Sequence, residues 1–343
     1  MNEMTKVERI KAALRKEEVD KLPYAFWTHL PGDDLIPEVV AEKTYEFYKR
    51  YDLDFIKMMN NGMYATEDFG CRADSSAVKS GGATVLTSSP IQTAEDWTRL
   101  EAPDIHKGAY GRELKHLQLL LEKTKGEVPV VLTVYTPLAT ANKIADSMLK
   151  YGKDNKPLCH IREGNGDKLK AALEVITETT CRFIREVIST GADGVFIASQ
   201  TSSYDYFTDE IYQEYGVPYD MRILDAAKGG WFNILHAHGD KLMFDTIKDY
   251  PVDAFNWHAF ETLPTLKEAR DLTGKCLIGG IQRYHITNRN KNAIIDEIYQ
   301  CLTDLKGRGH ILTPGCVVRY PLDPEILSFV RRAKEEIEAK ITY

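Results

Sequence analysis

The sequence predicts an α/β protein folded as a (β/α)8 TIM barrel, and three observations support this. Eight short runs rich in β-branched and aromatic residues are separated by segments with the i, i+3, i+4 apolar spacing of helices. Strands that alternate with helices form a parallel sheet, and eight such units close naturally into a barrel. A doubly wound open sheet is disfavoured because no GxGxxG motif follows the first predicted strand.

The predicted strands are spread along the whole chain, at residues 22–27, 54–59, 128–135, 194–199, 232–236, 254–257, 276–280 and 310–313. Helical periodicity is clearest in residues 169–189 and 292–306. The first twenty residues are charged and amphipathic, so we expect an opening helix there and not a signal peptide. No linker of low complexity divides the sequence, which predicts one barrel domain over residues 1–343.

Two long connections interrupt the strand–helix alternation. Residues 60–127 separate the second and third predicted strands, and residues 143–167 contain a charged loop with glycines and lysines. Both connections follow the carboxyl ends of strands, where barrel enzymes carry their active-site loops. We therefore expect insertions that act as lids at this face, with a small hairpin at residues 79–87.

Composition and charge exclude several classes of function. The 343-residue chain has a formal charge of −7 with both signs interspersed, whereas binding to nucleic acid needs a basic face. No window reaches the roughly 20 apolar residues that a membrane-spanning helix requires. The six cysteines form no CxxC pair and predict no disulfide framework. We expect a cytoplasmic protein with neither a nucleic-acid nor a membrane partner.

Three side chains at predicted strand ends suggest a metal site. His236 and His238 end the fifth predicted strand, and residues i and i+2 of a strand point to the same side. Cys316 follows the eighth strand in a Pro-Gly-Cys turn that lets the chain bend inward. Two imidazoles and a thiolate suit Zn²⁺ and leave a fourth coordination position open, as catalytic zinc sites do. A hydrogen-bonded histidine pair and a packed cysteine are the alternative interpretation.

The sequence resembles the uroporphyrinogen decarboxylase-like superfamily over nearly its whole length. The resemblance rests on the opening segments RIKAAL (residues 9–14) and VDKLP (residues 19–23), and on YTPLA (residues 135–139) after the third predicted strand. GADG (residues 191–194) at the fourth strand and GHIL (residues 309–312) at the last strand add to it. The superfamily includes zinc-dependent methyltransferases that act on methylated corrinoid proteins.

Two departures favour the corrinoid methyltransferase branch over true uroporphyrinogen decarboxylases. The decarboxylases carry an arginine-rich loop after strand one, but here that loop is FWTHLPGDD (residues 26–34), which would repel a substrate with many carboxylates. Their essential aspartate after strand two has no clear match. The methyltransferase branch carries an H-x-C…C zinc signature, which His236-Ala237-His238 and Pro314-Gly315-Cys316 resemble, with a histidine in place of the middle cysteine.

The resemblance implies a zinc-dependent transfer of a methyl group between a corrinoid and a small thiol, or another methyl acceptor or donor. The cofactors would be Zn²⁺ and a methylcobamide on a partner protein, and a homodimer is a further expectation from the superfamily. Two alternatives stay open: a metal-independent decarboxylase of a carboxylated small molecule or tetrapyrrole, and a non-catalytic corrinoid- or tetrapyrrole-binding protein.

Other candidate residues are assigned from their positions near strand ends. Glu67, after the second strand, is predicted to be a fourth zinc ligand or a proton shuttle, and Asp240 is predicted to accept an imidazole N–H or to cap a helix. For His258, after the sixth strand, packing is favoured over metal binding. Residues at further strand ends are predicted to contact substrate, namely His29, Asn60, Tyr135, Gln200 and Tyr204.

Overall fold

The computed structural model describes residues 3–341 and contains a sheet of seven parallel strands. Each strand lies within or overlaps one of the predicted runs, so the expected alternation of strands and helices is confirmed. In their order across the sheet the strands are β1 (Ile56–Lys57), β4 (Val130–Tyr135), β5 (Gly194–Ser199), β6 (Ile234–Ala237), β7 (Ala254–Asn256), β8 (Cys276–Ile281) and β9 (His310–Pro314). Apart from the hairpin inserted before β4, neighbours in the sheet are neighbours in sequence.

The segment predicted as the first strand joins the two edges of this sheet. Tyr24 forms a parallel bridge with Leu312 of β9, and the Ala25 amide donates to the Leu312 carbonyl at 3.0 Å. On the other side, the Asp54 amide donates to the Tyr24 carbonyl at 2.9 Å, just before β1 begins. This first predicted run therefore has the expected position between β9 and β1, although it makes too few ladder hydrogen bonds to count as a strand. Backbone hydrogen bonds link it to both edges, as the predicted barrel requires.

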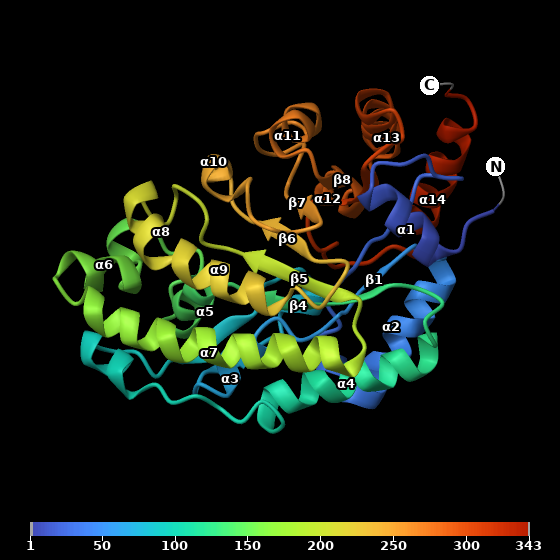
Figure 1. The fold of residues 1–343 in the computed structure, drawn as a ribbon. Helices are drawn as coiled ribbons and strands as arrows, with labels where there is room; N and C mark the ends of the chain where they lie inside the picture. Colours follow the sequence, from blue (N-terminus) through green and yellow to red (C-terminus); the bar gives the residue numbers. More distant parts are fainter. Residues whose placement is uncertain (1–2, 342–343) are drawn as a thin grey trace.

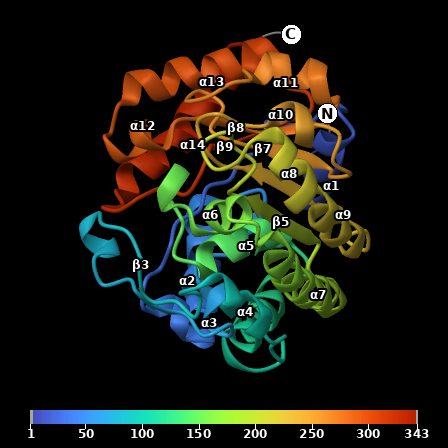
Figure 2. The same cartoon turned by 90° about the vertical axis from the view of Figure 1, so that its left-hand side faces the viewer.

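Helices lie around the outside of the sheet, as the two perpendicular views show (Figures 1 and 2). In the described part of the chain they are α1 (Lys6–Leu14), α2 (Pro37–Tyr51), α3 (Tyr64–Glu67), α4 (Gly108–Thr124), α5 (Pro137–Ile144), α6 (Lys156–Arg162), α7 (Gly166–Thr190), α8 (Asp209–Tyr215), α9 (Val217–Ala226), α10 (Phe244–Ile247), α11 (Leu266–Thr273), α12 (Arg283–Thr287), α13 (Lys291–Leu305) and α14 (Pro324–Glu338). Between residues 3 and 341, no helix has the length and apolar character needed to cross a bilayer.

Buried apolar side chains fill the inside of the barrel and the layer between strands and helices. Inside, Phe196 of β5 packs edge-on against Trp27, with ring centroids 5.5 Å apart. The strands β4 and β5 are buried on both faces, as expected for a parallel sheet covered by helices. Apolar packing of this kind fixes the strand ends relative to one another, so polar side chains at those ends are held in place.

The first predicted insertion follows the carboxyl end of β1, whereas the second begins in the last turn of α5, the helix that follows β4. The first contains α3, α4 and an antiparallel hairpin of β2 (Arg72–Asp74) and β3 (Val85–Ser88). The hairpin was predicted at residues 79–87, but those residues form its turn and most of its second strand. A short helical turn that ends at Gly81, where φ is +87°, interrupts the extended conformation that the sequence pattern suggested.

Candidate metal centre

Three ligand-type side chains meet at the carboxyl ends of the strands. They are His236, His258 and Cys316. One ring nitrogen of each histidine and the sulfur of the cysteine all lie within 4.8 Å of one another. His236 lies in β6, His258 lies two residues beyond β7, and Cys316 lies two residues beyond β9. Both histidines are buried and Cys316 is half-buried. Atoms at this separation are close enough to bind one ion.

The register of the sheet brings the two histidines together. His236 of β6 is paired with Asn256 of β7, so the chain that leaves β7 passes beside the His236 ring and places His258 there. The ring centroids of His236 and His258 lie 6.0 Å apart. The two histidines belong to different strand segments of the chain, so their proximity depends on the parallel alignment of β6 and β7.

The turn before Cys316 packs directly on the backbone at His258. A Cβ atom added to Gly315 would lie 2.7 Å from the His258 Cα and 2.9 Å from the Trp257 carbonyl oxygen, closer than real contacts allow. The Gly315 amide also donates to the Ile281 carbonyl at 3.1 Å. Glycine is therefore needed at this position for its lack of a side chain, and the close approach places the next residue, Cys316, beside His258.

A hydrogen bond fixes the orientation of the His236 ring. The Asn256 amide nitrogen donates to the Ile278 carbonyl at 2.8 Å, so its oxygen faces His236 and lies 2.6 Å from Nδ1. Since an amide oxygen only accepts, Nδ1 carries the proton and Nε2 keeps its lone pair. This is the arrangement found around metal-binding histidines, whose second nitrogen donates to a nearby acceptor.

The protonation states of His236 and Cys316 suit metal binding. Burial is the main cause that lowers the pKa of His236, to about 3, so its ring is neutral at physiological pH. Burial alone would raise the pKa of Cys316, but interaction with His258 and the charge of Arg283 lower that pKa to about 7. The Nε2 atom of His258 is buried and has no hydrogen-bond partner within the described residues. A neutral His236 ring and a readily formed Cys316 thiolate are forms that bind zinc.

The match to a family model identifies the chain. Residues 34–336 match the model for uroporphyrinogen decarboxylase (URO-D). The chain belongs to the URO-D family. The resemblance that the sequence motifs suggested is therefore confirmed, although the family name does not define the reaction of this member.

The curated relatives of this URO-D-family protein are distant and carry the names of methyltransferases. It is 25% identical to the methylcobamide:CoM methyltransferase MtbA of Methanosarcina mazei over 66% of this chain and 68% of that protein. It is 23% identical to MtbA of Methanosarcina acetivorans over 92% of this chain and 93% of that protein. A third relative is the methylcobamide:CoM methyltransferase MtaA of Methanosarcina barkeri, 21% identical over 63% of this chain and 64% of that protein.

Solved structures support the fold. A methyltransferase from Methanosarcina mazei superimposes with a TM-score of 0.83 at 18% identity, over 97% of this chain and 99% of that one. A B12-independent methionine synthase from Shewanella sp. W3-18-1 gives a TM-score of 0.56 at 14% identity, over 93% of this chain and 96% of that one. At these identities the likeness establishes the architecture alone.

The three residues that the structure brings together differ from the predicted metal ligands in one member. His258 takes the place that was predicted for His238, and packing had been favoured for His258. The reason is local: β6 ends at Ala237 and the chain turns at Gly239, where φ is +131°, so the strict alternation of a strand does not extend through His238. The ring of His238 remains close, with its centroid 4.9 Å from that of His258.

Neither predicted catalytic carboxylate is part of the three-residue group. Both carboxylate oxygens of Glu67 are bound by the Arg112 guanidinium, at 2.9 and 3.0 Å, so the structure shows this side chain in an ion pair and not as a ligand. Asp240 is exposed. The role of imidazole acceptor, which was predicted for Asp240, belongs to Asn256. Helix α10 begins after Met243, so Asp240 does not cap that helix either.

The residues predicted to contact substrate have different surroundings. His29 and Tyr135 both lie beside Gly62: a Cβ on Gly62 would be 3.6 Å from the His29 ring, and the Tyr135 hydroxyl donates to the Gly62 carbonyl at 3.0 Å. Asn60 and Gln200 each keep a side-chain oxygen that is buried without a hydrogen-bond partner in the described chain. Tyr204 is 53% exposed. Substrate contact remains a prediction for all five.

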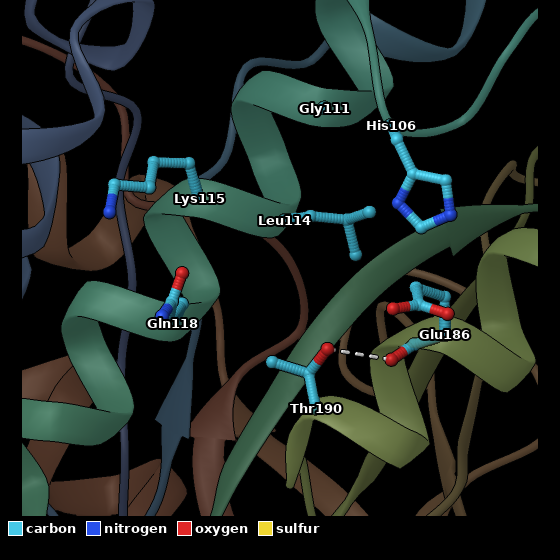
Figure 3. Close-up of a pocket in the computed structure, with 7 residues that line it drawn as sticks. All are labelled: His106, Gly111, Leu114, Lys115, Gln118, Glu186 and Thr190. Carbon is cyan, nitrogen blue, oxygen red and sulfur yellow. Dashed lines mark hydrogen bonds between the residues drawn. The ribbon is translucent and has the colours of Figure 1, made fainter.

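Two hollows of similar size lie elsewhere. One of about 440 Å³ lies between α4 and α7 and is lined by His106, Gly111, Leu114, Lys115, Gln118, Glu186 and Thr190 (Figure 3). Another of about 430 Å³ lies within the second insertion, lined by Leu149, Lys150, Tyr151 and Asp154. Neither is lined by a residue of the candidate metal centre, so these hollows contribute nothing to its chemistry.

Proposed function

We propose that this protein is a zinc-dependent methyltransferase that moves a methyl group between a corrinoid on a partner protein and a small thiol, or another small acceptor or donor. The observation that carries the proposal is the convergence of His236, His258 and Cys316 at the open end of the strands. The names of the curated relatives, which are methylcobamide:CoM methyltransferases, support the corrinoid and the thiol.

The donor set fits zinc. Two imidazole nitrogens and one thiolate give a three-ligand protein site with a fourth position for substrate. When bound, zinc would act as a Lewis acid that lowers the pKa of a thiol and holds its sulfur as a nucleophile. The chain supplies the geometry: Asn256 orients the His236 ring, and Gly315 lets Cys316 approach His258.

In the direction toward a thiol, the bond between the methyl carbon and cobalt breaks and its electron pair stays on cobalt. A lone pair of the sulfur forms the new carbon–sulfur bond, and the thiol proton is released to solvent beforehand. The side chains that face the substrate position at the metal centre would orient the methyl acceptor and limit access of water. His29 and Tyr135, which both lie beside Gly62, are our candidates for this role.

The test combines elemental analysis with a transfer assay. Purified protein should contain one zinc per chain, and it should demethylate free methylcobalamin in the presence of small thiols, followed by the change in visible absorption. Replacing Cys316 or His236 with alanine should lower the rate about 100-fold or more, since loss of metal removes several kcal/mol of transition-state stabilisation. Cys159→Ala, at a half-buried cysteine outside the site, is the matched control. A full rate after removal of all metal, or metal-independent release of carbon dioxide from a carboxylated substrate, would refute the proposal.

A further inference from the structure

Lys143 is a buried cation without a carboxylate partner. Its side chain lies in α5 and the residue is 4% exposed. The ammonium nitrogen donates to the Gly62 carbonyl at 2.8 Å and lies 3.5 Å from the centroid of the Tyr135 ring. An ammonium group has three N–H donors, and this contact uses one of them. The others have no carboxylate within 4.0 Å in the described structure.

Lys57 provides a second cation of the same kind. It ends β1, and its nitrogen lies 4.9 Å from the centroid of the Phe196 ring. Phe196 in turn stacks on His236 at 5.2 Å, so Lys57 and the candidate metal centre lie around one aromatic ring. Lys57 makes no ion pair among residues 3–341. It is half-buried, which shows that solvent still reaches its side chain.

The two lysines act on the same part of the molecule. Both charges contribute to the lowered pKa of His29, of which burial is the main cause. Lys143 also acts on His238, and Lys57 also acts on His236. Burial lowers the pKa of Lys143 to about 7. Burial also lowers the pKa of Lys57, to about 8, and the negative charge of Cys316 offsets that effect only in part.

No carboxylate forms an ion pair with either lysine in the described part of the chain, and the one negative group that acts directly on Lys57 is the Cys316 thiolate. Arg283, which is buried, adds a third positive charge that acts on His236, His238 and Cys316. Two carboxylates act on this side. Glu261 has His258, at 4.0 Å, and Arg283 as its partners. Glu113, whose charge acts on Tyr135, pairs with Arg112 at 3.4 Å. The region is therefore positive even before a metal ion binds. A buried, unpaired cation is unfavourable in the free protein, and an incoming anion would relieve that cost.

We propose that Lys143 and Lys57 bind the anionic end of the small substrate, a carboxylate or sulfonate, while its methyl-carrying or methyl-accepting atom occupies the metal centre. The part of this inference that concerns the metal centre rests on the proposed function, whereas binding of the anion by the two lysines does not. The lysines would thus determine specificity for acidic over neutral substrates. The positive field of the two lysines would also favour an ionised thiol at the centre.

The test uses probes that differ only in charge. Zinc-loaded protein is titrated calorimetrically with 3-mercaptopropionate and with 3-mercaptopropanamide, which have the same length and the same thiol. We expect the acid to bind about 10-fold or more tightly than the amide, as charge-assisted hydrogen bonds do relative to neutral ones. Lys143→Met and Lys57→Met should each remove most of this preference and leave binding of the amide and the zinc content unchanged. Lys150→Met, which removes a rim lysine paired with Asp146, should retain the preference.

A second arm does not depend on zinc. In chelator-treated protein, propane-1-sulfonate should raise the midpoint of thermal unfolding and propane-1-sulfonamide should not, and Lys143→Met should abolish the difference. If Lys143→Met fails to fold, Lys143→Gln and Lys57→Met replace it. Equal binding of acid and amide by zinc-loaded wild type would overturn the anion site but not the proposed function. Absence of zinc binding would overturn the proposed function, and the second arm would still decide the anion site.

Discussion

The Nδ1 atom of His236 lies 2.6 Å from the Oδ1 atom of Asn256, and this contact decides which nitrogen of the imidazole is free to bind a metal. Asn256 cannot rotate its amide without losing the 2.8 Å bond to the Ile278 carbonyl. The pair joins neighbouring strands, β6 and β7, at their carboxyl ends. Asn256 thus has the role of imidazole acceptor that was predicted for Asp240.

The first prediction concerns this contact. Asn256→Ala should weaken zinc binding about 10- to 100-fold, since the His236 ring loses the acceptor that fixes its tautomer and orientation. Asn256→Asp should retain zinc, because a carboxylate also accepts from Nδ1–H. Affinity is measured by competition with a chelating dye, and Asn288→Ala, at an exposed position, serves as the control. Unchanged affinity in Asn256→Ala would show that the contact does not support the ligand.

A second prediction distinguishes the two neighbouring histidines. His258→Ala should lower the zinc content of purified protein well below one per chain, because His258 belongs to the convergent group. His238→Ala should retain the ion, with a smaller loss of affinity. Both variants are compared by elemental analysis after dialysis against a weak chelator. If instead His238→Ala loses zinc and His258→Ala keeps it, the ligand set predicted from sequence is the correct one.

The third prediction follows from the lowered pKa of Cys316. In metal-free protein the rate of alkylation by iodoacetamide should rise with pH through a midpoint of about 7 and level off once the thiolate predominates. Because the folded-state pKa lies below the ordinary value of 9.0, this group stabilises the fold fully above pH 9 and loses that contribution as the pH falls through 7. His258→Ala should move the alkylation profile to higher pH, since the partner that favours the thiolate is removed. Cys316→Ser identifies the reacting thiol, and a profile centred near 9 in the wild type would contradict the prediction.

A fourth prediction tests the close approach of two loops. Gly315→Ala should weaken zinc binding, because its Cβ would meet the His258 backbone at 2.7 Å and push Cys316 away from the histidines. Overpacking of this kind costs about 1–3 kcal/mol, so the free energy of unfolding in urea should fall by a similar amount. Gly126→Ala is a poor control, because φ is +77° at Gly126 and alanine would be strained there. Asp240→Ala, in the exposed loop after β6, is the better comparison. A Gly315→Ala variant with native stability and native zinc affinity would show that the loop has room to move.

The sequence by itself determined the architecture and two of the three convergent residues. Runs of β-branched residues that alternate with amphipathic helices specify a parallel sheet, because the helices bury their apolar sides by packing against the strands. His236 and Cys316 could be identified because each depends on local features, a strand end and a Pro-Gly turn. The same reasoning selected His238, since two histidines in one strand are expected to share a face.

Only the tertiary structure decided the rest of the site. His258 joins the group through the register between β6 and β7, and Asn256 replaces Asp240 as the acceptor for the same reason. Lys143 reaches the Gly62 carbonyl across 81 positions of sequence, so nothing near either residue indicates that this lysine is buried without a partner. Local patterns determine which elements form and where they end, whereas contacts between different strands depend on how those elements pack in space.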